Sequence, residues 1–197
     1  IFSPGILKIT VLTALFSAGA QGGYYAVTAW LPTFLRAERG LTVVGSTGYL
    51  ATLIVGSFVG YLVGAWLADR LGRRKLFFVF SIGAILLVFA YTQLPISNAV
   101  MWFLGFPLGF FASGYYSGIG AFFTELFPTR VRGSGQGFAF NFGRALGAVF
   151  PTLVGYLSAT MTLAQAIAVF AIAAYGLLFV AALLLPETRG KVLKADG

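Results

Sequence analysis

Six long apolar segments constrain this chain more than any other feature of its sequence. A helix that crosses a bilayer needs roughly 20 predominantly apolar residues, and short polar breaks divide the chain into six segments of about that length or more. They cover residues 7–35, 44–68, 76–94, 99–123, 134–157 and 163–185. We predict an all-α membrane protein in which residues 1–185 form one bundle of six transmembrane helices. Residues 186–197 are predicted to form a cytoplasmic tail.

The composition supports insertion into a lipid bilayer and excludes several kinds of chemistry. Apolar residues make up 59% of the chain and charged residues only 9%, whereas soluble domains carry about a quarter charged residues. The chain has no histidine and no cysteine, which excludes the commonest zinc sites, thiol catalysis and the usual general base. It also lacks the phosphate-binding loop of ATP-driven pumps. We therefore expect no enzyme, no metal and no cofactor.

The basic residues are distributed unequally between the two sides of the predicted bundle. Cytoplasmic loops of membrane proteins carry an excess of Lys and Arg, so we expect both termini in the cytoplasm. The net charge of +8 then reflects membrane topology, and no nucleic-acid partner is expected. One side has Lys8, Arg70, Arg73, Arg74, Lys75, Arg130, Arg132, Arg189, Lys191 and Lys194, the other has Arg36 and Arg39, and Arg144 belongs to neither.

Arg144 stands in the middle of the apolar stretch "FNFGRALGAVF". Ten residues into a helix that starts near residue 134, it would lie about 15 Å deep, where a charge costs from about 3 to more than 10 kcal/mol. Its partner is either an acid outside this chain or a substrate carboxylate bound by the two-pronged guanidinium, and the sequence favours the substrate. The acids of the chain all fall in loops, at helix ends or in the tail: Glu38, Asp69, Glu125, Glu187 and Asp196.

Polar residues on two other segments accompany this arginine. Thr10, Thr13, Ser17, Gln21, Tyr24 and Thr28 recur every three or four residues, so they share one helix face. Such a stripe should face protein or water rather than lipid, and both hydrogen bonding between helices and the wall of an aqueous cavity remain open. The candidate substrate-binding residues are Arg144, Asn141, Gln21, Tyr24, Tyr115, Tyr116 and Ser17.

Small residues recur at every fourth position of the second segment: Gly48, Thr52, Gly56, Gly60, Gly64 and Ala68. A smooth face of this kind lets helix backbones approach closely in lipid. It favours tight packing, and it is also compatible with helices that slide during a transport cycle.

The loops between the segments resemble those of a known family. "ADRLGRRK" resembles the signature loop of the major facilitator superfamily, Gly-x-x-x-Asp-Arg-x-Gly-Arg-Arg/Lys, with Ala65 at its first glycine position. "ELFPTRVRG" is similar to the loop after the tenth helix of that superfamily, and "PETRG" resembles the tail after its twelfth helix. The loop residues that the resemblance makes candidates for gating are Asp69, Arg70, Gly72, Arg73, Arg74, Glu125 and Arg130.

The resemblance implies that the chain is the C-terminal half, helices seven to twelve, of such a transporter. It begins "IFSPGILK", without Met or the features of a signal peptide, and we expect it to be part of a longer protein. The implied fold packs this half against an N-terminal six-helix half in the bilayer. The substrate cavity would lie between the halves near the midplane and alternate in its access.

Residues 123–157 look most like organic-acid and sialate proton symporters, and aromatic-acid symporters have a Gly-x-Gly-Arg segment that ends at the position of Arg144. The resemblance implies symport of a small organic anion with protons in a plasma membrane, the inner membrane of a bacterium. The proton-coupling acid is expected in the other half. The alternatives are a sugar porter for a neutral hexose and a membrane scaffold or receptor without transport.

Overall fold

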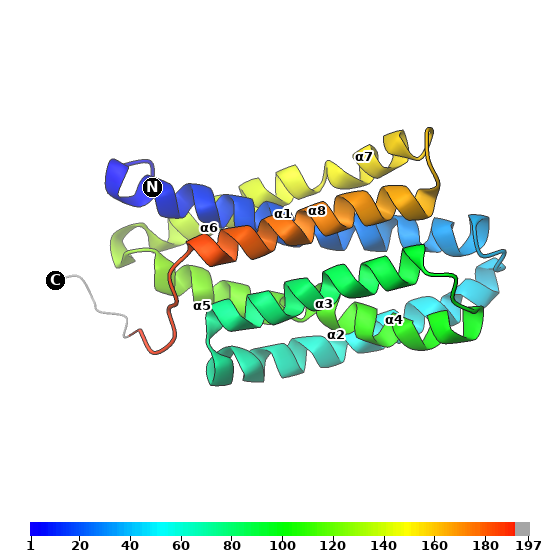
Figure 1. Cartoon of the computed structure of the whole chain (residues 1–197). Coiled ribbons are helices and arrows are strands. Elements are labelled where there is room, and N and C mark those ends of the chain that lie inside the picture. Colours follow the sequence, from blue (N-terminus) through cyan, green and yellow to red (C-terminus); the bar gives the residue numbers. More distant parts are fainter. Residues whose placement is uncertain (192–197) are drawn as a thin grey trace.

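A computed structural model describes residues 1–191 as a bundle of long helices (Figure 1). Residues 192–197 of the predicted tail lie outside this range. The elements are α1 (Pro4–Ala37), α2 (Val43–Leu71), α3 (Arg73–Gln93), α4 (Asn98–Ser113), α5 (Tyr116–Leu126), the 3-10 helix η1 (Thr129–Val131), α6 (Arg132–Gly147), α7 (Phe150–Leu157) and α8 (Leu163–Leu184).

The six predicted segments are confirmed, but two of them consist of two helices each. Helices α1, α2, α3 and α8 are each long and apolar enough to cross a membrane. The fourth segment is divided into α4 and α5, and the fifth into α6 and α7. The prediction of one uninterrupted helix in each of these two segments is therefore wrong.

Local backbone chemistry explains both interruptions. Pro151 has no N–H to donate, and just before it the chain tightens, so that the N–H of Val149 bonds to the carbonyl of Leu146 at 3.1 Å. After Gly114, the N–H of Gly118 bonds to the carbonyl of Tyr115, also at 3.1 Å. These three-residue bonds belong to the tighter 3-10 geometry, which commonly marks irregular points in helices.

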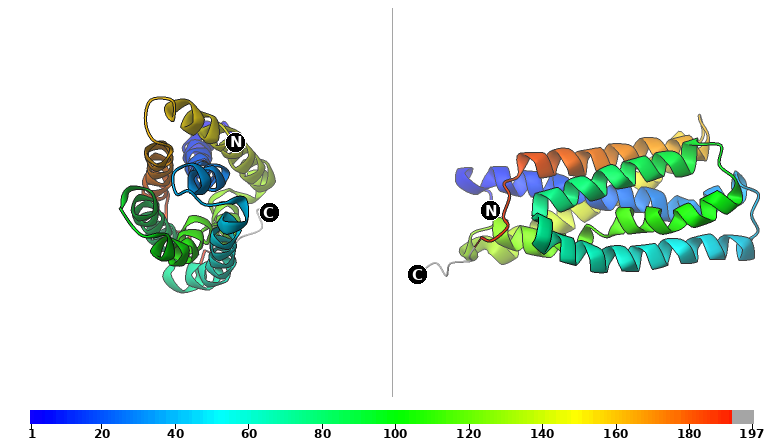
Figure 2. Two further views of the ribbon diagram at one scale, coloured as in Figure 1. Left: turned by 90° about the vertical axis from the view of Figure 1, so that its right-hand side faces the viewer. Right: turned by 60° about the horizontal axis from the view of Figure 1, so that its bottom comes forward.

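Helix α1 is the central element of the packing. It contacts α8 and α6 extensively and α7 less so, while α2 pairs with α4 and α3 with α8. The view along the bundle in Figure 2 shows α1 between the α6–α7 side and α8. The start of α1 and the end of α8 lie at the same end of the bundle (Figure 1), as six crossings require.

The small-residue face of α2 packs directly on the backbone of α4. A Cβ at Gly56 would meet the carbonyl of Phe106, and one at Gly60 would meet the carbonyl of Phe110. Ser57 adds a hydrogen bond across the same contact, from its hydroxyl to the carbonyl of Gly109 at 3.3 Å. The glycines are therefore explained by close packing of two helices, as expected for membrane bundles.

We expect Gly56→Ala to separate α2 from α4, because the methyl group would overlap the Phe106 carbonyl, which is backbone and cannot rotate away. Overpacking of this kind costs about 1–3 kcal/mol, measurable as a lower melting temperature of the full-length protein in detergent. Gly176→Ala is the control, since nothing lies within 4 Å of a Cβ at Gly176. Equal melting temperatures for the two variants would contradict this account of the contact.

Candidate functional site

Two consecutive tyrosines at the start of α5 bind the middle of α1. The hydroxyls of Tyr115 and Tyr116 both donate to the carbonyl of Ala20, at 2.6 and 3.2 Å. Their rings stack with centroids 4.7 Å apart. Tyr115 is fully buried, whereas Tyr116 is half-buried. Of these two candidate residues, Tyr116 is therefore the accessible one, and the buried Tyr115 ring packs against it.

Helices α1 and α6 approach closely enough for side chains to bind backbone. The carbonyl of Phe140 accepts hydrogen bonds from the hydroxyl of Ser17 at 3.3 Å and from the amide of Gln21 at 3.2 Å. Both side chains are buried, and the Gln21 amide oxygen accepts a further bond from the Tyr25 hydroxyl at 3.2 Å. The structure thus uses Ser17 and Gln21 to join the two helices.

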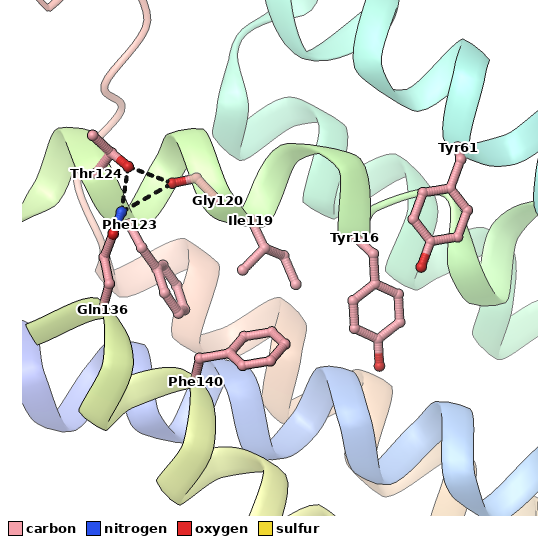
Figure 3. Close-up of a pocket in the computed structure, with 8 residues that line it drawn as sticks. All are labelled: Tyr61, Tyr116, Ile119, Gly120, Phe123, Thr124, Gln136 and Phe140. Carbon is pink, nitrogen blue, oxygen red and sulfur yellow. Dashed lines mark hydrogen bonds between the residues drawn. The ribbon is translucent and has the colours of Figure 1, made fainter. Parts of the chain in front are cut away.

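A cavity of about 450 Å³ opens between α2, α5 and α6. Its volume falls within the range of small-molecule sites. Figure 3 shows the Gln136 amide donating to the carbonyl of Gly120, at 3.2 Å, and to the hydroxyl of Thr124. The lining residues are Tyr61, Tyr116, Ile119, Gly120, Phe123, Thr124, Gln136 and Phe140.

Two tyrosines that line this cavity form an aromatic cluster with a third tyrosine from α1. The Tyr61 ring on α2 lies nearly parallel to the Tyr116 ring, with centroids 6.3 Å apart and planes at 13°. The Tyr24 ring on α1 meets the Tyr116 ring edge to face at 5.8 Å and 82°. We call Tyr24, Tyr61 and Tyr116 the tyrosine wall. Its members Tyr61 and Tyr116 line the cavity.

Arg144 is exposed, and its side chain makes no hydrogen bond or ion pair with any other residue in the range 1–191. It follows the cavity-lining Phe140 by four residues and so lies one turn further along the same side of α6. Its neighbour Gly143 contacts Ser17, which places Arg144 at about the depth of the Ala20 carbonyl that holds Tyr116.

Asn141 is also exposed on α6, and its side-chain amide donates to the carbonyl of Gly137 at 2.9 Å. Among the residues predicted for the substrate site, the structure therefore brings Tyr24 and Tyr116 together directly. Arg144 and Asn141 are exposed on α6 and are not among the residues that line the cavity.

Of the eight residues that line the cavity, the sequence predicted Tyr116 alone. Three of the other seven show why. Tyr61 was hidden because its neighbours Gly60 and Gly64 were assigned to the packing face of α2. Phe140 looked like an ordinary apolar residue of a membrane helix. Gln136 carried a usable signal, an amide inside an apolar segment, but the position of that amide relative to α5 depends on the tertiary fold.

The signature loop forms a network around Arg73. Its guanidinium contacts Asp69 at 2.6 Å and binds both carboxylate oxygens of Glu125 at 2.8 and 3.2 Å. The Thr188 hydroxyl donates to the same Glu125 carboxylate at 2.5 Å. Arg130 is exposed and takes no part in these contacts. The network links the ends of α2, α3 and α5 with the residues that follow α8.

Glu187 caps the start of α3 from the other end of the sequence. Its carboxylate accepts the backbone N–H groups of Arg73 and Arg74 at 2.9 and 3.1 Å, and those of Thr188 and Arg189 as well. Gly72 makes the approach feasible, because its φ of 98° suits glycine and a Cβ there would press on the carboxylate. Partial burial acts to raise the pKa of Glu187, but the four N–H donors outweigh it and lower the pKa below its ordinary value of 4.5.

This lowered pKa predicts a specific loss of stability in acid. The unfolded chain binds a proton at Glu187 more tightly than the folded chain, so the stabilisation is complete above about pH 4.5 and disappears as the pH falls through the lowered pKa. Glu187→Gln should lower the melting temperature at pH 7 and reduce its decline between pH 5 and 3, measured by thermal unfolding. Asp69→Asn is the control at an exposed pair, which is worth at most about 1 kcal/mol. A Glu187→Gln profile parallel to that of the unmodified protein would contradict the cap.

The comparisons with known proteins agree with this architecture. The family model described as Major Facilitator Superfamily matches residues 1–151. A probable 4-methylmuconolactone transporter of Cupriavidus pinatubonensis is 36% identical over 200 residues, which cover 100% of this chain and 46% of that protein. The cis,cis-muconate transport protein of Acinetobacter baylyi is 31% identical over 150 residues, covering 75% of this chain and 36% of that protein.

A gallate transporter of Pseudomonas putida is 28% identical over 132 residues, 66% of this chain and 29% of that protein. The chain spans less than half the length of these three relatives. Family and relatives are transporters rather than enzymes, as the sequence analysis expected. The apolar helices, their packing and the match to the family over more than three quarters of the residues lead to one conclusion: the chain is an integral membrane protein that belongs to the major facilitator superfamily.

Proposed function

We propose that this chain forms one half of a secondary transporter that carries a small organic anion by alternating access. The observation that carries the proposal is Arg144, a cation midway along a membrane crossing that makes no ion pair within residues 1–191. Because a charge at that depth is costly without a partner, a partner of opposite charge is required. A substrate carboxylate meets that requirement with two parallel hydrogen bonds to the guanidinium.

The tyrosine wall supports a planar, conjugated or aromatic acid as the substrate. Aromatic side chains bind flat π systems by offset stacking or edge-to-face contact, and Tyr61 and Tyr116 present nearly parallel faces to the cavity. Arg144 lies at about the depth of the wall, so one ligand could place its carboxylate on the guanidinium and its flat body against the rings. Muconate and gallate, which appear in the names of two relatives, are both carboxylates of this shape.

The remaining parts of the proposal concern the whole transporter. The open cavity and the exposed residues Asn141 and Arg144 of α6 would face an N-terminal six-helix half. The two halves would close the site between them. Symport with protons requires a titratable group near the substrate. The described acids lie at or near helix ends, so we assign the coupling acid to the other half. The excess of basic residues at the end of the bundle where α1 begins and α8 ends supports a cytoplasmic position for that end, and we assign the protein to a bacterial inner membrane.

Replacement of Arg144 tests the carboxylate partner. Arg144→Gln in the full-length protein should leave the melting temperature nearly unchanged, because the side chain has no partner within residues 1–191, and should weaken binding of muconate and gallate. Hydrogen bonds to charged groups are worth about 1.5–3 kcal/mol, so the dissociation constant measured by calorimetry should rise about 10- to 150-fold. Arg144→Lys should restore part of this affinity.

Arg36→Gln serves as the matched control, since Arg36 is exposed at the opposite end of α1 from the N-terminus, and within residues 1–191 its side chain bonds only to the carbonyl of Pro32. Unchanged acid binding in Arg144→Gln would refute the proposal. Loss of folding in Arg144→Gln would instead identify a structural ion pair with an acid of the other half. Uptake of labelled acid into proteoliposomes then separates a transporter from a protein that only binds.

Replacement of Tyr61 tests the tyrosine wall. Tyr61→Ala removes a ring face, and aromatic contacts of this kind are worth about 0.5–1.5 kcal/mol, so gallate affinity should fall about two- to tenfold. Tyr61→Phe keeps the ring and should bind gallate nearly as well as the unmodified protein. A saturated acid such as adipate provides the comparison. If Tyr61→Ala weakened adipate and gallate equally, the ring would not be a stacking surface.

A further inference from the structure

We propose that the turn joining α2 and α3 binds the headgroup of an acidic phospholipid. Two basic side chains flank this turn, Arg70 in the last turn of α2 and Lys75 in the first turn of α3, and both are exposed. The turn lies at the end of the bundle where α1 begins and α8 ends (Figure 1). This surface is separate from the cavity between α2, α5 and α6, so the inference does not depend on the identity of the substrate.

The positive charge at this turn is not neutralised by nearby acids. Asp69 and Glu125 both pair with Arg73, and the Glu187 carboxylate is occupied by backbone N–H groups. Arg70 and Lys75 make no ion pair with any residue between positions 1 and 191. Both therefore remain free to bind an external anion.

Aromatic contacts hold the neighbouring guanidinium groups at the level where an apolar helix surface ends. Arg70 lies over the exposed Trp66 ring, 5.4 Å from its centroid, and Arg74 lies over the Phe78 ring at 5.6 Å. Arg74 also donates to the carbonyls of Ala182 and Leu183 at the end of α8, at 3.1 and 2.7 Å. The two hydrogen bonds of Arg74 hold the start of α3 against the end of α8, next to the free charges of Arg70 and Lys75.

Exposed apolar stripes run from this turn along both helices, in the direction that acyl chains would take. The stripe on α3 is the more informative, because α3 packs on α8, α4 and α2 and takes no part in lining the cavity. Its exposed residues are Val79, Ile82, Leu86 and Phe89, and those on α2 are Ile54, Phe58, Leu62 and Trp66.

This combination fits an acidic phospholipid better than a zwitterionic one. A phosphate ester binds Arg and Lys through charge-assisted hydrogen bonds, and a headgroup with net negative charge leaves that attraction uncancelled. Basic clusters at the membrane surface attract anionic lipid by about 1 kcal/mol for each residue, which corresponds to about fivefold in affinity. The apolar stripes would hold the acyl chains of the same molecule.

The test measures retained lipid on the purified full-length protein by native mass spectrometry, with phosphatidylglycerol and phosphatidylcholine as probes. The unmodified protein should retain phosphatidylglycerol in preference to phosphatidylcholine. The double variant Arg70→Gln, Lys75→Gln should lower the affinity for phosphatidylglycerol about 5- to 25-fold and should leave the affinity for phosphatidylcholine unchanged. Trp66→Leu, which keeps both charges and removes the aromatic support, should lower it less.

Arg130→Gln is the matched control, because Arg130 is an exposed arginine at the same end of the bundle, between α5 and α6. If Arg130→Gln and the single variant Arg70→Gln lowered the affinity for phosphatidylglycerol equally, only the overall charge would matter. That result would overturn the proposed lipid site. Unchanged phosphatidylglycerol retention in the double variant, or equal retention of the two lipids by the unmodified protein, would also overturn it. A melting temperature for each variant, taken in detergent without lipid, confirms that the compared proteins are folded.

Discussion

Backbone hydrogen bonding in an apolar solvent governs the arrangement of this half-transporter. In the centre of a bilayer, each N–H and C=O group must find its partner within the protein, so long helices are required and every interruption must be accommodated. The interruption before α5 lies beside Tyr115 and Tyr116, whose hydroxyls bind a carbonyl of the uninterrupted α1. The irregular point is thus placed where side chains and a neighbouring helix enclose it, and the same contacts position the accessible ring of Tyr116.

Close approach of helix backbones connects this constraint with the candidate site. Gly143 lets α6 approach α1 until Ser17 and Gln21 can bind the Phe140 carbonyl, and that contact sets the depth and direction of α6. Phe140 then lines the cavity, and Arg144 follows it by one helical turn. The polar stripe on α1 therefore has two parts. Ser17 and Gln21 face inward and hold helices together, while Tyr24 reaches the tyrosine wall. Hydrogen bonding between helices, one of the two interpretations left open by the sequence, therefore applies to Ser17 and Gln21, while a cavity-wall role for Tyr24 stays a prediction.

The sequence predicted the helices well because their cause is local. Length and hydropathy identify a membrane crossing without knowledge of its neighbours, and all six segments were found within a few residues of their ends. The interruption before Pro151 could have been foreseen from the missing N–H, but the one at Tyr115 has no comparable signal. Site residues were harder to predict. Arg144 stood out because its charge is costly anywhere in an apolar segment, whereas Tyr61 and Phe140 acquire their roles only from the residues opposite them.

By itself, the sequence determined the class of protein, the number of membrane crossings, the unequal distribution of basic residues and the isolation of Arg144. Each follows from composition or from spacing along one chain, so no knowledge of folding was needed. Tertiary structure decided which polar residues hydrogen-bond between helices and which tyrosines pack together. It also decided that Glu187 caps α3, which begins more than 100 positions earlier in the sequence. These outcomes depend on how six helices rotate and approach one another. That is a collective property of their contacts, and no single segment encodes it.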